Sequence, residues 1–81
     1  MTKRRILITG SGGIGGVNFV RALRLAERLK EREEMYLVGT DFNRYHLEFP
    51  PLDARYKTPR HSDPKFIEEI LKIAEREKIE F

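Results

Sequence analysis

The feature that most constrains this chain is a cluster of glycines directly behind a short apolar run. Five of the six glycines lie between positions 10 and 16, immediately after residues 6–9, which read Ile-Leu-Ile-Thr. A helical pattern of apolar residues begins at Val17. Strand, glycine turn and helix in this order are typical of the start of an α/β domain with a parallel sheet.

The glycine turn predicts an anion site. Glycine allows positive φ and close backbone approach, as a strand that turns tightly into a helix requires. The free N–H groups of the first helical turn, together with the helix dipole, favour a phosphate or carboxylate. The spacing fits G-x-x-G-x-x-G at positions 10, 13 and 16, and also G-x-G-x-x-G at 10, 12 and 15. The alternative interpretation is that the glycines only permit tight packing of strand against helix.

Two helices and three further strands are predicted after the turn. Residues 17–30 form the first helix, and residues 35–40 form a near-continuous apolar strand. Residues 43–47 and 52–55 are expected to form short turns around Pro50 and Pro51, and residues 56–58 a short third strand. Ser62-Asp63-Pro64 predicts the start of the second helix, which ends near Glu77 or Lys78. Residues 79–81 begin a fourth strand.

Each helix has an apolar stripe that we expect to be buried. Arg24 and Glu27, between the apolar positions of the first helix, are interpreted as part of a solvated charged face. The predicted buried stripes are Phe19, Ala22, Leu23, Ala26 and Leu29 in the first helix, and Phe66, Ile67, Ile70, Leu71 and Ala74 in the second.

Composition excludes several classes of protein. The 81 residues contain no cysteine, which excludes disulfides and cysteine-held metals. No apolar run approaches the ~20 residues of a membrane span. The net charge of +3 comes from interspersed Lys, Arg and Glu, which favours a solvated surface over a nucleic-acid patch. We therefore expect a cytoplasmic protein without nucleic-acid or membrane partners. Its charge density is typical of a thermophilic source.

Polar residues follow the second and third strands at the edge where open α/β sheets bind ligands. Asp41 could accept hydrogen bonds from a ribose, or it could cap the turn that follows it. Arg60 and His61 come after the third strand, on the same side as the glycine turn. His46 and His61 lack metal-ligand spacing and are expected to be surface or packing residues.

Two families begin with such a turn. Residues 9–16 satisfy the T-G-x-x-G-x-x-G of extended short-chain dehydrogenases and epimerases, in which Asp41 would hold the ribose of NAD(P). Their third strand leads into a D-[LIV]-x-D type segment, and nothing in this chain matches that segment.

The whole chain instead resembles the N-terminal, pre-ATP-grasp domain of ATP-grasp ligases, and is most similar to proteins like the carbamoyl-phosphate synthase large subunit. The matching segments include V-G-x-D-x-N-x-Y-H, D-x-x-Y-x-V-P-R, D-P-x-[FY]-I and E-K-I-D. Departures are Ile14-Gly15, where many relatives have Pro-Ala, and Glu80, where Asp is commoner. The matching segments lie, in order, at residues 6–13, 16–18, 38–46, 52–60, 63–67 and 77–81.

The resemblance implies a role in joining a carboxylate to an amine through an acyl-phosphate. ATP and Mg²⁺ would be held by two further lobes of the parent ligase, and no cofactor by this chain. The chain would be inactive alone, without a catalytic residue or metal ligand, and would bind a small carboxylate or acyl-phosphate substrate. The implied substrate-binding residues are Gly10, Ser11, Gly12, Gly13, Ile14, Gly15, Gly16, Asp41, Asn43 and Arg60. A cofactor half of an NAD(P)-dependent epimerase and a standalone Rossmann-like module remain alternatives.

The expected architecture is one α/β domain over residues 1–81, a Rossmann-like (pre-ATP-grasp) three-layer fragment with a parallel sheet of three to four strands. We expect strand order 3-2-1, the two helices on opposite faces, and a domain that is incomplete at its C-terminal end. The other edge of the first strand would be open, which predicts a homo-oligomer formed through that edge or through a surface that the remaining ATP-grasp lobes would cover.

Overall fold

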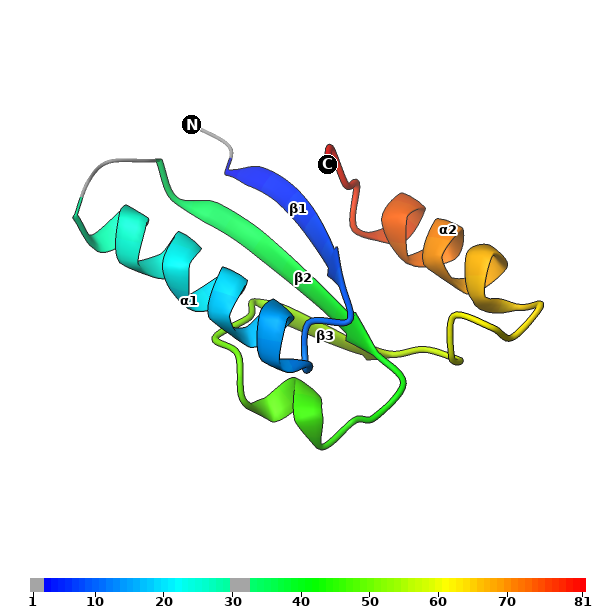
Figure 1. Ribbon diagram of the computed structural model, residues 1–81. Coiled ribbons are helices and arrows are strands. Elements are labelled where there is room, and N and C mark those ends of the chain that lie inside the picture. Colours follow the sequence, from blue (N-terminus) through cyan, green and yellow to red (C-terminus); the bar gives the residue numbers. More distant parts are fainter. Residues whose placement is uncertain (1–2, 30–32) are drawn as a thin grey trace.

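Three parallel strands form the centre of the structure, a computed structural model that describes residues 3–29 and 33–81 (Figure 1). The strands are β1 (Arg4–Thr9), β2 (Met35–Asp41) and β3 (Ala54–Lys57). Their order in the sheet is β1-β2-β3, which confirms the predicted order 3-2-1. With the two helices, the chain is a small α/β domain.

β3 begins two residues earlier than predicted, within residues 52–55, for which the sequence predicts a turn. The backbone N–H of Asp53 bonds to the carbonyl oxygen of Leu37 at 2.9 Å, and its carboxylate accepts the N–H of Leu37 at 2.7 Å. These two bonds align the chain with β2, so that Ala54 already pairs with Val38. A short helical turn is predicted over residues 43–47, and the 3-10 helix η1 (His46–Glu48) lies three residues later, overlapping that range at His46 and Leu47.

Helix α1 spans Ile14–Arg28 and begins three residues before the predicted start. Gly13 has extended backbone and is the N-cap, so Gly15 and Gly16 lie inside the first helical turn. At the other end, Lys30, where we predicted the helix to finish, lies outside the described residues.

The predicted buried stripe of α1 is wrong for several of its residues. Phe19 is 53% exposed and Leu29 is 59% exposed, whereas Val17 and Val20 are buried. The rotation of the helix explains this difference. Gly16 packs directly on the backbone of Gly10 and Ser11, leaving no room for a Cβ. With Gly16 facing the turn, Val20 faces the core over the sheet and Val17 faces the side of η1.

The two helices pack on opposite faces of the sheet, as expected (Figure 1). Val20 of α1 joins the main core cluster, whose other members are Ile8, Met35, Leu37, Leu47 and Leu52. Helix α2 (Phe66–Arg76) lies against the other face. There Glu77, just after α2, accepts bonds from the Arg5 guanidinium at 2.9 Å and from the Tyr56 hydroxyl at 2.5 Å.

Helix α2 also differs from its predicted bounds and buried face. It begins at Phe66 rather than at Pro64, because the Asp63 carboxylate accepts the N–H of Lys65 and forms a turn before the helix. Ile67 and Leu71, predicted to be buried, are 63% and 62% exposed, and Ile73 is the buried residue. The apolar stripe of α2 is therefore only half covered.

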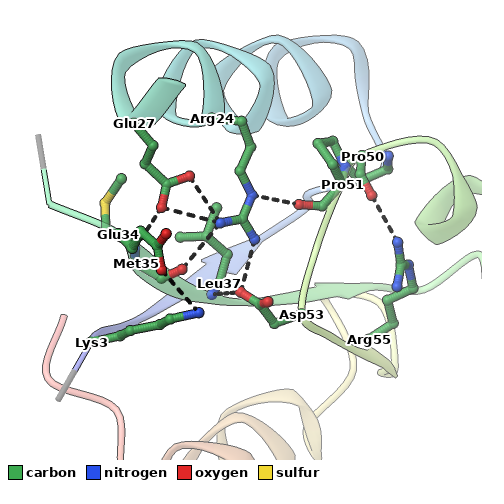
Figure 2. Close-up of polar contacts among 10 residues, drawn as sticks. All are labelled: Lys3, Arg24, Glu27, Glu34, Met35, Leu37, Pro50, Pro51, Asp53 and Arg55. Atoms are coloured by element: carbon green, nitrogen blue, oxygen red, sulfur yellow. Dashed lines mark hydrogen bonds and ion pairs between the residues drawn. The ribbon is translucent and has the colours of Figure 1, made fainter. Parts of the chain in front are cut away.

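A polar cluster joins α1 to the start of β2 and to the loop before β3 (Figure 2). Arg24 donates to Glu27 at 3.0 Å, to Asp53 at 2.8 Å, and to the carbonyl oxygens of Met35 at 3.1 Å and Pro51 at 2.9 Å. Glu27 in turn accepts the N–H of Met35 at 2.5 Å. Arg24 and Glu27 are therefore half-buried structural residues, and their assignment to a solvated face is wrong.

The cluster predicts an acid-sensitive contribution to stability. Burial alone would raise the pKa of Asp53, but the Leu37 N–H and Arg24 outweigh it and hold that pKa below its ordinary value of 3.8. A lowered folded-state pKa stabilises the fold above the unfolded pKa, and this stabilisation is lost as pH falls through the folded one.

We therefore expect Asp53→Asn to lower the free energy of unfolding by about 1–3 kcal/mol at about pH 6. The difference from the wild type should shrink toward about pH 2. Urea unfolding at both pH values measures it. A difference that stays constant with pH would contradict the assigned role of the Asp53 charge.

Candidate functional site

The glycine turn joins the carboxyl end of β1 to α1. Gly10 has φ of 61°, a conformation that side chains with a Cβ rarely adopt. Its carbonyl oxygen accepts the N–H of Gly13 at 3.1 Å. Ser11 is fully buried, and both its N–H and its hydroxyl donate to the carbonyl oxygen of Thr40, at 3.0 and 3.3 Å. The Ser11 side chain therefore ties the turn to β2 and faces away from solvent.

Three of the five clustered glycines have a geometric reason to be glycine. Gly10 has positive φ, a Cβ at Gly12 would overlap His46 and Asp41, and a Cβ at Gly16 would overlap the backbone of Gly10 and Ser11. At Gly13 an added Cβ makes ordinary contact, and at Gly15 it meets open space. The geometry therefore requires glycine at positions 10, 12 and 16. This spacing coincides with neither predicted pattern.

The first turn of α1 carries the free donors. The N–H groups of Ile14, Gly15 and Gly16 have no hydrogen-bond acceptor among residues 3–29 and 33–81. Ile14 is highly exposed and Gly15 is exposed, so solvent reaches this end of the helix. Free N–H groups at the positive end of a helix dipole favour a carboxylate or phosphate.

Asp41 holds the glycine turn in place. It is the last residue of β2, rather than following it, and is only 7% exposed. One carboxylate oxygen accepts the N–H of Gly12 and the other accepts the N–H of Asn43, both at 3.0 Å. Both oxygens therefore have backbone donors. The bond to Asn43 corresponds to the interpretation of Asp41 as the cap of the turn that follows it. The bond to Gly12 shows that Asp41 also caps the glycine turn.

Asn43 and Arg60 also reach this edge of the sheet. The side-chain oxygen of Asn43 accepts the N–H of Tyr45 at 3.0 Å and shapes the loop that leads to η1. The guanidinium of Arg60 stacks over the ring of Phe42, 4.4 Å from its centroid. This cation–π contact holds the positive charge of Arg60 beside the end of β2.

Two hollows flank the glycine turn. One, of about 360 Å³, lies between the end of β2 and the start of α2. The other, of about 420 Å³, lies between α1 and η1. The first is lined by Thr9, Gly10, Gly13, Asp41, Phe42, Thr58, Pro59, His61 and Phe66. A larger hollow of about 800 Å³ lies elsewhere, along α1 beside Pro51, and does not include the turn.

Sequence reasoning missed Phe42 as a site residue. Its ring lines the first hollow and carries the Arg60 guanidinium. An aromatic residue directly after Asp41, at a strand end, was the available signal. Phe42 and Arg60 are eighteen positions apart, so only the pairing of β2 with β3 brings them together.

The described residues were also compared with the requirements of a metal site and of a membrane-spanning helix. Among the described residues, no three His, Asp or Glu side chains converge as metal ligands. Within the same ranges, no helix has the length and apolar character needed to cross a membrane.

Comparison with protein-family models, curated proteins and solved structures finds no match to this chain. The geometry described above is therefore the basis for assigning a function. It defines a small α/β domain whose candidate anion site lies at the carboxyl edge of a parallel sheet.

Proposed function

We propose that this chain is the substrate-side, N-terminal domain of an ATP-grasp ligase that joins a carboxylate to an amine, similar to the carbamoyl-phosphate synthase large subunit. The fold would then be Rossmann-like. The order and spacing of the resembling segments across the chain support the proposal. The exposed N–H groups of Ile14 and Gly15 at the carboxyl edge of the sheet are the observation that carries it.

The hydrogen-bond donors at this site suit a small anion that carries no nucleotide. The N-terminus of α1 supplies N–H groups, and Arg60 supplies a positive charge held on Phe42. Together they would bind a small carboxylate or acyl-phosphate and stabilise negative charge on its oxygens. Asp41 would act as a positioning residue, because it holds Gly12 through the N–H bond.

In such ligases, ATP supplies the phosphoryl group and Mg²⁺ neutralises its negative charge. The described residues offer no cluster of three carboxylate or histidine ligands for the metal, and no step through ATP is assigned to them. We propose that these groups are held by further lobes of the ligase, and that the isolated chain does not catalyse the reaction.

The second candidate is the cofactor half of an NAD(P)-dependent epimerase or dehydrogenase. The tight turn at Gly10 and Gly12 favours it, since a dinucleotide site needs such a turn. The two backbone bonds of Asp41 count against it, because a ribose would have to compete with the N–H groups of Gly12 and Asn43.

A titration followed by amide NMR separates the two candidates. We expect phosphonoacetate, a stable analogue of an acyl-phosphate, to shift the amides of Ile14, Gly15 and Gly16 with a Kd on the order of 1 mM. Arg60→Gln should weaken this binding several-fold, while Arg44→Gln, an exposed charge in the neighbouring loop, should not. Tight binding of NAD⁺ at the turn would overturn the ligase proposal.

A further inference from the structure

The hollow between α1 and η1 continues away from the glycine turn, beyond the groups to which a role has been given. It starts beside Ile14 and extends along α1 as far as Arg21. Ile14, Val17 and Arg21 stand at i, i+3 and i+7, so they lie on one side of the helix. His46 and Phe49, from η1 and the residue after it, form the facing wall.

The facing wall of this hollow is anchored to the rest of the domain. Leu47 of η1 is part of the main core cluster. The guanidinium of Arg55 donates to the carbonyl oxygen of Leu47 at 2.8 Å and to that of Pro50 at 3.0 Å, the second of which Figure 2 shows. His46 packs directly on Gly12 and leaves no room there for a Cβ. The hollow is therefore bounded by elements with fixed positions on both sides.

The middle of the hollow is apolar. Val17 is buried at its base, and the ring of Phe49, which is 64% exposed, stands opposite. The Phe49 ring is tilted by 42° against the ring of His46, with 6.4 Å between their centroids. An apolar group placed between Val17 and Phe49 would cover carbon surface that water now reaches. An apolar middle with a few polar groups around it is typical of small-molecule sites.

The two ends of the hollow both suit a negative charge. The near end is the start of α1, where the N–H groups of Ile14 and Gly15 are exposed. At the far end stands Arg21, which is exposed and makes no ion pair with a described residue. Asn18, one turn before it, adds a side-chain amide to the lining. A guanidinium beside an amide favours a carboxylate, because both donate hydrogen bonds to its oxygens.

The distance between the two ends limits the length of a ligand that could reach both. Seven residues separate Ile14 from Arg21, which corresponds to about 10 Å along the helix axis. Helical side chains lean toward the N-terminus, so the Arg21 guanidinium lies nearer to the turn than its own Cα. A benzene ring with an acetate group at each end is suited to such a span. Malonate, whose two carboxylates share one carbon, is too short for it.

We infer that the hollow between α1 and η1 binds the far part of the substrate, and that this substrate is a dicarboxylate whose acid groups are joined by a flat apolar stem. One carboxylate would bind at the glycine turn, the stem would lie between Val17 and Phe49, and the second carboxylate would bind Arg21 and Asn18. The inference rests on the proposed function, since it names the substrate class of that site. Arg21 would then distinguish a dicarboxylate from an acid with one charge.

Titrations followed by NMR with para-phenylenediacetate, phenylacetate and malonate test this inference. All three acids should shift the backbone amides of Ile14 and Gly15. Only para-phenylenediacetate should also shift the side-chain amide of Asn18 and the Nε–H of Arg21. It should bind about three- to fivefold more tightly than phenylacetate, which is the effect of one exposed ion pair.

Variants of exposed residues assign the effect to individual contacts. Arg21→Gln should remove the advantage of para-phenylenediacetate over phenylacetate and leave the binding of phenylacetate and malonate unchanged. Arg28→Gln, which removes the same charge from an exposed position of α1 outside this hollow, should preserve the advantage. Phe49→Ser should weaken both aromatic acids equally and leave malonate unaffected.

The possible failures are distinguishable. Equal affinity for the two aromatic acids, or an advantage that survives in Arg21→Gln, would overturn the inference while the proposed function stands on the phosphonoacetate titration. An equal loss of malonate binding in Arg21→Gln would also overturn it, because the effect would then be one of net charge. If neither phosphonoacetate nor these acids shift Ile14 and Gly15, the proposed function fails and the inference fails with it.

Discussion

Gly16→Ala should destabilise the fold by about 2–4 kcal/mol, although alanine is the better helix former. The added Cβ would overlap backbone atoms of Gly10 and Ser11, and backbone cannot move aside as a flexible side chain does. The contact joins α1 to the turn that carries the candidate site. For a domain of this size, such a loss is a large part of the total stability.

The adjacent glycine provides the matched control. Gly15→Ala places its Cβ in open space and should stabilise the chain by about 0.5 kcal/mol through the better helix propensity of alanine. Urea unfolding followed by circular dichroism measures both variants. Equal stabilities would contradict the close approach of α1 to the turn.

Arg24→Met should cost about 2–4 kcal/mol of unfolding free energy. Methionine keeps much of the apolar stem but removes every donor, leaving Glu27 and Asp53 without their common cation. The carbonyl oxygens of Met35 and Pro51 lose their Arg24 donors as well. The expected result is a lower urea midpoint and a loosened loop before β3.

Arg21→Met is the control, since Arg21 is exposed on the same helix and makes no ion pair with a described residue. It should change stability by no more than about 0.5 kcal/mol. A double variant that also carries Asp53→Asn should be less destabilised than the sum of the single variants, because both act on one network. Full additivity would show that Arg24 and Asp53 contribute independently.

The candidate site was predictable in position more than in detail. The local signals, glycines after a strand and polar residues at strand ends, located Gly10–Gly16, Asp41, Asn43 and Arg60 at one edge. Their individual roles depended on contacts. Ser11 is buried against Thr40, and Asp41 bonds the N–H of Gly12 across 29 positions of sequence. No local pattern contains such a partner.

The errors on the helices have one physical cause. A helical repeat gives the spacing of apolar residues, but it does not say which side faces the sheet when apolar residues cover more than one side. In α1, Gly16 decides the rotation, and it places Arg24 rather than Phe19 over the sheet. In α2, the bonds of Glu77 to Arg5 and Tyr56 hold one side of the helix against the sheet, and Ile67 on another side is left exposed.

Local patterns of residues specify the class of fold, a parallel α/β sheet with a glycine turn at its carboxyl edge. That information is local, because strand, turn and helix signals each span a few residues. Long-range packing determines which glycines are required, which face of each helix is covered, and that residues 79–81 pair with half of β1. The N–H of Glu80 donates to the carbonyl oxygen of Arg5, and the N–H of Leu7 donates to that of Phe81, both at 2.9 Å, so the edge predicted to be open is occupied along its first half. These features depend on atoms that approach closely from distant parts of the chain.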